Sequence, residues 1–491
     1  MTENKLINLV KTFSKEDMKN FGKFISSPYF SSSRDLKPLY NFLKKYYPDF
    51  KPAALTEEKI FKKLYPRKVY VPKKFSHILQ VLFSEMFKHA EKFIVYESLK
   101  GKNFNYMFNM SLSEIYMNKQ LYDLSLKNLV KITGEYKRFD RANYVRNLLE
   151  TYMHISDVFI FKVQPEKNYD YTSNAILYMY AYIIELMAYF HNKNRVNLRN
   201  YNIRFKGSEF FFKFVSEFDI EQFNKDCNED EYGTKTLTII KYYYLKSFVD
   251  EKSDEHIPLA AQLLLDNFDK FTYSIQYDLF SLIFNRCIGK ASSNPVYFHL
   301  GNKLVDFVWG KGVVSTSQNK FIFIVTFTSI LNFKMATVDA KNIQEFAEKY
   351  IDKVEPEYKK IAKSYSSAVI LFKKNAFSHC LKEISIEEKV PFFIKNGYHI
   401  LKICSLYELE YNESLVSAVD AFEHFTRKNK SVSALYKSSN LNFVQTIKKL
   451  IRLKIDNNGN HLKLTEEITE LSGSSYYKWW FEEKILEIRG K

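Results

Sequence analysis

The sequence predicts an all-α protein: a basic N-terminal helical domain followed by a right-handed, tetratricopeptide-like solenoid of helix pairs. Three observations predict this fold. Apolar residues recur at three- and four-residue intervals along most of the chain, which is the period of one helical face. Only 13 Gly and 11 Pro occur among 491 residues, too few for a turn-rich sandwich or barrel. Two segments also carry a degenerate tetratricopeptide spacing.

Residues 1–100 form the predicted basic helical domain. They contain 20 Lys and Arg against 10 Asp and Glu, a net charge of +10, whereas the whole chain carries +17. Six of the 11 prolines lie within the first 72 residues. A helix of roughly 25 residues is expected from about Lys73. Its apolar face consists of Leu79, Leu82, Phe83, Met86, Ala90, Phe93 and Ile94.

Residues 101–491 form the predicted solenoid. The remaining prolines each precede a long apolar-periodic segment, where proline in the first helical turn is tolerated; they are Pro165, Pro258, Pro295, Pro356 and Pro391. The intervals 258–295 and 356–391 correspond to about one helix pair each. Two further apolar faces fit helices: Ile343, Phe346, Ala347, Tyr350, Ile351 and Val354, then Phe443, Val444, Ile447, Leu450 and Ile451. In all we expect roughly 18–22 helices.

Two helix pairs match the tetratricopeptide spacing. In that pattern a small and a large residue precede a turn, and an aromatic, a small and an apolar residue follow it. One matching set is Ser113, Tyr116, Gln120, Tyr122, Ser125 and Leu129. The other is Ala368, Leu371, Asn375, Phe377, Cys380 and Ile384. The small residues are expected where the two helices cross closely. Trp479 and Trp480 belong to an expected capping helix at about 463–489.

Both ends of the chain resemble one protein family. The segments FSKEDMKNFGKFISSPYFSSSRDLKPLYNFLKKYYPDF and LTEEKIFKKLYP look like the N-terminus of a family of large bacterial all-helical proteins. The segment EHFTRKNKSVSALYKSSNLNFVQTIKKLIRLK is similar to the same family near its end. The resemblance implies a tetratricopeptide-like solenoid, and it implies no activity, substrate or catalytic residue. Residues 200–340 match the family least, so repeat boundaries are not assigned there.

The candidate nucleic-acid-binding residues form a basic patch near the N-terminus. They are Lys59, Lys62, Lys63, Arg67, Lys68, Lys73 and Lys74, and residues 59–84 contain no acid. Tyr65, Tyr70 and Phe75 are interleaved with them. Basic side chains with aromatics beside a helix start can hold a phosphate backbone. The alternative is a solvated, lysine-rich turn between two amphipathic helices.

No local motif predicts catalysis, a metal site or a cofactor. The ten histidines include no HExxH pair, and GxxxxGK[ST], GxSxG and GxGxxG are absent. Asp226, Glu229, Asp230 and Glu231 could form a cation loop, but they lack the alternating order of a calcium site and favour a solvated loop. Glu185, within an apolar segment, is expected at a helix edge or beside a Lys or Tyr. We therefore expect a protein that is not an enzyme.

The cysteines, the apolar runs and the first residues indicate in which cellular compartment the protein is expected. Cys227, Cys287, Cys380 and Cys404 form no CxxC, so buried reduced thiols are expected. The apolar runs Ile176–Phe190 and Phe321–Phe333 are shorter than the ~20 residues of a membrane span. The first dozen residues lack the apolar core of a secretory signal. These features predict a cytoplasmic protein without a membrane partner.

The predicted function is that of a non-enzymatic scaffold or adaptor. Solenoids present extended concave surfaces, which here would hold a protein or peptide partner. The alternative is a nucleic-acid-associated regulator that contacts phosphates through the basic patch. Against it, only 12 of the 73 basic residues are Arg, the residue preferred for bidentate phosphate recognition. The sequence does not specify the oligomeric state.

Overall fold

The protein is built from helices. The structure, a computed structural model, describes residues 4–30, 34–50, 55–99, 104–135, 144–200, 207–230, 233–291, 293–316, 320–384, 390–430, 432–455, 461–472 and 477–489. Helix accounts for 80% of the structure, and these ranges contain 24 α-helices and no strand. The all-α class is confirmed. Extended pairing in the same ranges is limited to one isolated bridge between Ile322 and Val354.

The chain divides into two compact units, residues 1–171 and 172–491. The first unit contains α1 (Lys5–Val10), α2 (Lys15–Ser26), α3 (Lys37–Lys44), α4 (Glu57–Leu64), α5 (Pro72–Leu99), α6 (Phe104–Asn118), α7 (Tyr122–Glu135), α8 (Tyr144–Phe161) and the start of α9 (Pro165–Asn200). The predicted domain boundary near residue 100 falls between α5 and α6, within this unit, and it stays a prediction.

Helices α1–α5 share one hydrophobic core. The predicted face of α5 is buried from Leu79 to Phe93, whereas Ile94 is partly exposed. This helix has 28 residues and confirms the long helix expected from about Lys73. Ser14 begins α2 with a reciprocal cap: its hydroxyl accepts the N–H of Asp17, and the Asp17 carboxylate accepts the N–H of Ser14. This capping hydrogen bond lowers the pKa of Asp17.

The second unit holds the remaining helices. They are α10 (Ser208–Glu217), α11 (Ile220–Asp226), α12 (Thr234–Val249), α13 (His256–Asp266), α14 (Tyr273–Lys290), α15 (Val296–Gly310), α16 (Ile324–Thr337), α17 (Ala340–Tyr350), α18 (Lys359–Lys373), α19 (Phe377–Glu383), α20 (Phe392–Glu408), α21 (Asn412–Lys428), α22 (Ala434–Ile455), α23 (His461–Ser472) and α24 (Lys478–Arg489). Three 3-10 helices, η4 (Phe268–Lys270), η5 (Ile351–Lys353) and η6 (Pro356–Tyr358), lie between them.

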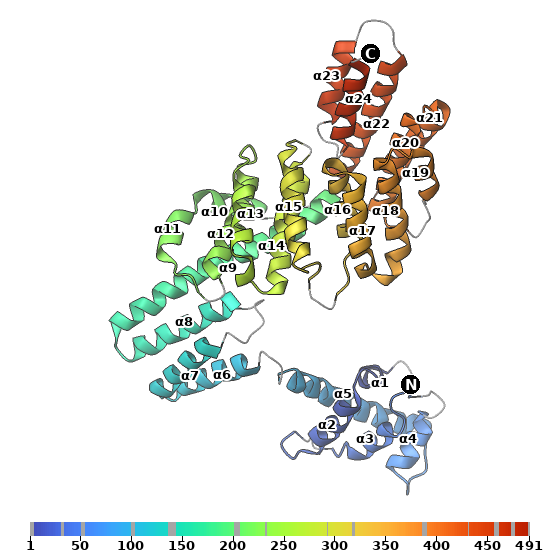
Figure 1. The fold of residues 1–491 in the computed structure, drawn as a ribbon. Coiled ribbons are helices and arrows are strands. Elements are labelled where there is room, and N and C mark those ends of the chain that lie inside the picture. Colours follow the sequence, from blue (N-terminus) through green and yellow to red (C-terminus); the bar gives the residue numbers. More distant parts are fainter. Residues whose placement is uncertain are drawn as a thin grey trace. The chain divides into compact units, whose positions relative to one another are not determined.

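Helices that are neighbours in the chain pack against each other in the second unit. From α12 to α24 each α-helix contacts the next, and α12 also contacts α14, α13 contacts α15, α16 contacts α18, and α18 contacts α20. Figure 1 shows this series from green α12 to orange α21. One continuous hydrophobic core extends from Ile184 to Ile485. Most of the helix contacts in this core are therefore between helices that are close along the chain.

Four helix pairs share the same three-residue connection. The pairs are α6–α7, α8–α9, α18–α19 and α20–α21. In each, the second connecting residue has a positive φ: Gln120 (61°), Val163 (55°), Asn375 (56°) and Glu410 (58°). The amides of this residue and of the next one bond back to the last turn of the first helix, as in Leu121 N–H to the Tyr116 carbonyl (2.8 Å). This is the Schellman ending, and the same turn recurs in both units.

The predicted small positions lie where the helices of a pair meet. Ser113 and Ser125 are buried, and the Ser125 hydroxyl donates to the Ser113 carbonyl at 3.1 Å between α6 and α7. Ala368 on α18 and Cys380 on α19 are fully buried. The segment expected to contain one capping helix, at about 463–489, contains two described helices, α23 and α24.

Candidate functional site: an aromatic pocket with an acidic rim

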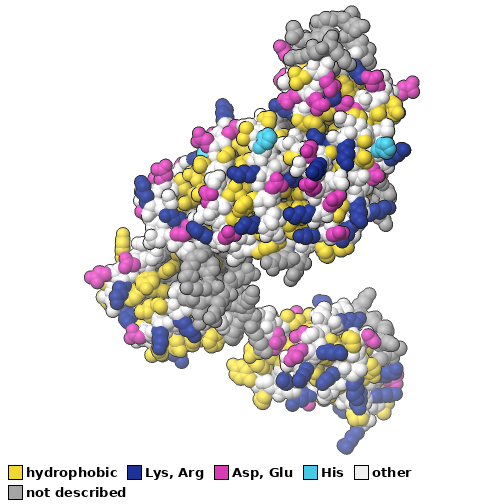
Figure 2. Space-filling view, in the orientation of Figure 1, with side chains coloured by type: hydrophobic (Ala, Val, Ile, Leu, Met, Phe, Trp, Pro, Cys, Tyr) yellow, Lys and Arg dark blue, Asp and Glu magenta, His cyan; other side chains and the backbone are white. Residues whose placement is uncertain are grey.

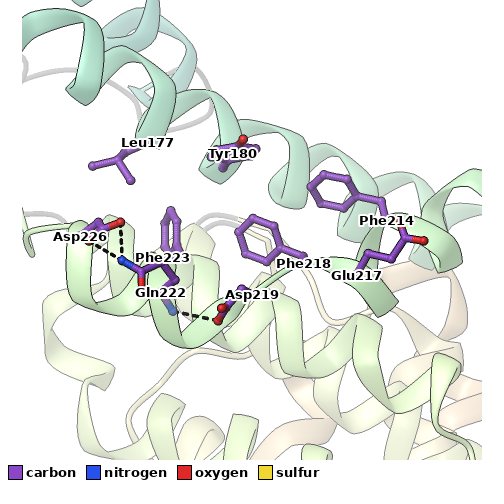
Figure 3. A pocket seen from close by; sticks show the side chains of 9 residues that line it. All are labelled: Leu177, Tyr180, Phe214, Glu217, Phe218, Asp219, Gln222, Phe223 and Asp226. Carbon is purple, nitrogen blue, oxygen red and sulfur yellow. Dashed lines mark hydrogen bonds between the residues drawn. The ribbon is translucent and has the colours of Figure 1, made fainter. Parts of the chain in front are cut away.

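An open pocket of about 400 Å³ lies among α9, α10 and α11 in the second unit. Figure 3 shows Leu177 and Tyr180 on α9 facing the side chains of α11 and of the connection before it. Its floor is apolar and is formed by Leu177, Tyr180, Phe214, Phe218 and Phe223. Its rim is polar and is formed by Glu217, Asp219, Gln222 and Asp226. The volume lies within the range of pockets that take small ligands or single side chains.

Phe218 is the centre of the floor. Its ring stacks on Phe214 at 5.4 Å between centroids, and it contacts Tyr180 at 5.6 Å and Phe223 at 5.9 Å. Tyr242 on α12 supports the ring from behind at 5.9 Å, and its hydroxyl donates to the Phe218 carbonyl at 3.4 Å. Burial raises the pKa of Tyr242, and the nearby Asp219 adds to the rise. Aromatic contacts from four helices, α9 to α12, thus hold the floor in place.

Two rim carboxylates are fixed by local hydrogen bonds. Asp219 is the N-cap of α11, and one of its oxygens accepts the amides of Glu221 (3.1 Å) and Gln222 (2.9 Å). This is why α11 begins there, since a capping carboxylate satisfies free amides of the first turn. The Gln222 side-chain amide then donates to both oxygens of Asp226, each at 2.9 Å. Asp219 and Asp226 are exposed to solvent but are already oriented.

Within the described ranges, the rim acids have no cationic partner: no Lys, Arg or His forms an ion pair with Glu217, Asp219 or Asp226. Elsewhere in the unit, four acids each meet a buried lysine at 2.7–2.9 Å: Glu185 with Lys241, Asp254 with Lys290, Asp306 with Lys334, and Glu408 with Lys484. Among the described residues, the rim therefore carries negative charge that no ion pair compensates, in a chain of net charge +17.

The acidic cluster of the sequence is divided by the structure. Asp226 lies on the pocket rim. Glu229 accepts hydrogen bonds from the amide and hydroxyl of Thr236, and Asp230 accepts the amide of Thr234 at 2.9 Å. These two acids therefore cap the start of α12, while Glu231 lies outside the described residues. Among the described side chains, no group of three His, Cys, Asp or Glu is placed to hold a metal ion.

Glu185 and the four cysteines have the surroundings that the sequence predicts. Glu185 was expected beside a Lys or Tyr, and its carboxylate meets the Lys241 ammonium at 2.8 Å between α9 and α12. The four cysteines are buried and form no disulfide. Burial raises the pKa of Cys227 and of Cys380 to about 11. These thiols are consequently protonated and unreactive at neutral pH.

The predicted basic patch is exposed on the first unit. Lys59, Lys62 and Lys63 lie on α4, and Arg67 and Lys68 lie in the turn that follows. All five side chains are exposed, and Figure 2 shows many Lys and Arg side chains over α1–α5. The backbone of Lys73 and Lys74 is in the first turn of α5, but their side chains lie outside the described residues.

Acids and aromatics of α4 weaken the patch as a phosphate site. Glu58 pairs with Lys62 at 2.6 Å, so one cation is already partly compensated. The rings of Tyr65 and Tyr70 pack on buried Phe61, at 5.0 and 5.4 Å between centroids. The Tyr70 hydroxyl also donates to Glu57 at 3.2 Å. These tyrosines stabilise the helical core and are not arranged as a stacking platform for bases.

Comparisons with known proteins identify no relative of this chain. No family model, curated protein or solved structure matches it. Of the helices that the structure describes, none combines the length and the apolar character needed to cross a membrane.

Sequence reasoning identified only one residue of the pocket, Asp226. The missed signal is the aromatic-rich stretch at 210–223, in which four rings and Val215 are followed by Glu217, Phe218 and Asp219. Its partner side chains, Leu177 and Tyr180, are more than 30 residues earlier and are indistinguishable from core residues in the sequence.

Proposed function

We propose that this protein is a non-enzymatic interaction scaffold whose helix pairs form a right-handed, tetratricopeptide-like solenoid that holds a protein or peptide partner. The observation that carries the proposal is the α9–α11 pocket. It is an open, aromatic-floored site on a helical array, and within the described ranges the chain's own cations leave its acidic rim unpaired. Such convergence of apolar floor and charged rim is typical of a recognition site.

The solenoid arrangement is supported by the recurring turn and by the order of packing. Four pairs use the same three-residue connection, and helices of the second unit contact mainly their first and second neighbours in the chain. Nearest-neighbour packing of this kind is typical of a solenoid. Buried Ser113, Ser125, Ala368 and Cys380 occupy the small positions of the tetratricopeptide spacing.

The scaffold function is also supported by the use of the buried polar groups. Arg286 on α14 is buried, donates through Nε to the Ser247 hydroxyl at 3.0 Å, and stacks on Phe248 at 4.0 Å. Lys290 bonds Asp254 at 2.8 Å, and the same carboxylate accepts the Tyr297 hydroxyl at 2.8 Å. These hydrogen bonds lower the pKa of Asp254 to about 2. Arg286 thus joins α14 to α12, and Asp254 joins the α12–α13 connection to α14 and α15, so these groups hold the helical array together.

The second candidate function is nucleic-acid binding through the basic patch. It is favoured by the five exposed basic side chains on α4 and its following turn. The two functions can be separated by affinity purification of the full chain from its host, with mass spectrometry and nucleic-acid quantification. The scaffold function predicts a protein partner that survives nuclease treatment and is retained by the variant Lys62→Glu/Lys63→Glu/Lys68→Glu. Recovery of nucleic acid alone, lost with that variant, would contradict it.

A further inference from the structure

The α9–α11 pocket has a chemistry that selects its ligand. The floor offers aromatic faces, and the rim offers Glu217, Asp219 and Asp226. Anions are repelled by this rim. A hydrophobic ligand without charge would make no use of the negative charge of the rim, and a hydrophilic cation would leave the aromatic floor in contact with water. The matching ligand is both cationic and apolar.

From this complementarity we infer that the pocket binds a basic, amphipathic peptide segment of a partner protein, in which an arginine stands beside a large apolar residue. The apolar side chain enters the floor around Phe218, and the guanidinium stacks on a ring while it donates to a rim carboxylate. Arginine suits this position because its planar group stacks on aromatics and pairs with carboxylates in fixed geometry. The inference rests on the proposed scaffold function and names the partner's chemistry.

The pocket is preorganised for such a ligand. Asp219 is held by two amides and Asp226 by Gln222, so neither carboxylate must be immobilised when the cation arrives. The Phe218 ring is packed on three sides by Phe214, Phe223 and Tyr242. Fixed partners reduce the entropy that binding costs. The rim charge also attracts a basic segment from a distance at low ionic strength.

The chain contains a matched control for each carboxylate. Asp339 is the N-cap of α17 and accepts the Asn342 amide at 2.8 Å, as Asp219 caps α11. Asp266 on α13 accepts the side-chain amide of Gln262 at 2.7 Å across the same i,i+4 spacing as Asp226 and Gln222. Neither control residue lines the pocket. Asparagine retains the ability to cap a helix at 219 and 339, and at 226 and 266 it keeps an oxygen that accepts the glutamine amide, so we expect both double variants to fold.

The test measures binding of fluorescein-labelled peptides to the full chain by anisotropy in 50 mM salt. The probes are eight-residue peptides with Arg beside Phe, Leu or Trp, and two controls in which the apolar residue is Ser or the arginine is Gln. We expect Asp219→Asn/Asp226→Asn to weaken binding about five- to thirtyfold, from two exposed charge pairs. Asp339→Asn/Asp266→Asn should bind as the wild type does. Both control peptides should bind at least about fivefold more weakly than the parent.

Three outcomes would overturn the inference: equal weakening by the two double variants, no binding of any probe at 1 mM, or full competition by spermine at the concentration of the peptide. The last would show that charge alone is recognised. A purified protein partner that is retained by Asp219→Asn/Asp226→Asn would leave the scaffold function standing and place its contact elsewhere. The two proposals therefore fail separately.

Discussion

The ring of Tyr365 on α18 covers the backbone of Gly397 on α20. A Cβ atom at position 397 would lie 2.3 Å from the phenolic oxygen and 2.9 Å from the nearest ring carbon. Tyr365 has no freedom to retreat, because it is fully buried and its hydroxyl donates to Asn332 at 2.8 Å. The absence of a side chain at Gly397 thus sets how closely two neighbouring helix pairs approach.

Gly397→Ala should destabilise the second unit by about 1–3 kcal/mol through overpacking, less the roughly 1 kcal/mol that alanine adds to a helix. Urea unfolding followed by circular dichroism measures the change. Gly310→Ala is the control, since Gly310 ends α15 and a Cβ there meets nothing within 4 Å. It should be neutral or stabilising. Equal effects of the two substitutions would show that the Tyr365 side chain moves to accommodate the added methyl group.

Val163→Gly should stabilise the first unit. Val163 adopts a φ of 55° between α8 and α9, a left-handed conformation that β-branched residues rarely adopt, and its side chain is 83% exposed. Relief of that conformation is expected to add about 0.5–1.5 kcal/mol after the entropy cost of glycine.

The control for Val163 is Gln120, which occupies the equivalent position between α6 and α7 with a φ of 61°. Gln120→Gly should give a smaller gain, because glutamine is not β-branched. Thermal unfolding of both variants checks the order of the effects. A midpoint of thermal unfolding for Val163→Gly below that of the wild type would contradict the prediction. The left-handed conformation of Val163 would then not lower the stability of the protein.

His399 should make the second unit sensitive to acid. Burial against Phe422 and Phe425, together with Lys402 and Lys395, lowers the pKa of His399 to about 4. The unfolded chain binds a proton near pH 6.5 and the folded one does not, so stability is full above pH 6.5 and falls as the pH drops toward 4. His399→Phe keeps a ring in place and should reduce the loss between pH 7 and pH 5 by about 1 kcal/mol. The readout is the shift of the urea midpoint between pH 7 and pH 5. An equal shift in the wild type and in His399→Phe would contradict this prediction.

The basic patch should show only weak association with duplex DNA, lost by about 0.15 M salt, if the scaffold function is right. If five cations meet phosphates, the log–log salt slope should instead be about −4 to −5. Lys62→Glu/Lys63→Glu/Lys68→Glu would then abolish binding. Lys341→Glu/Lys349→Glu/Lys353→Glu changes the net charge equally on exposed residues of the second unit and serves as the control. Anisotropy titrations at three salt concentrations distinguish the two functions.

Local sequence determined which residues are helical and which face is buried. The predicted faces at 79–94, 343–354 and 443–451 are buried as the three-to-four spacing predicts, except at three isoleucines. Ile94 is partly exposed, and Ile351 and Ile451 are half-buried. The number of helices was underestimated, because short helices such as α1, α11 and α19 hold few periodic residues. The shared turn was predicted at Gln120 and Asn375 and missed at Val163 and Glu410. Neither valine nor glutamate is a turn residue, so the left-handed conformation there is imposed by packing of the flanking helices.

The pocket and the charge pairing were decided by the tertiary structure. Leu177 and Phe223, which both line the pocket, are 46 residues apart in the sequence. Glu185 and its ion-pair partner Lys241 are 56 residues apart. Helical period and capping act over a few residues, so they fix where a helix begins and which face is apolar. They carry no information on which of many lysines meets a given acid. That choice follows from how α9, α11 and α12 pack, since only the packed chain brings a cation to Glu185 and, within the described residues, leaves the rim of the pocket without one.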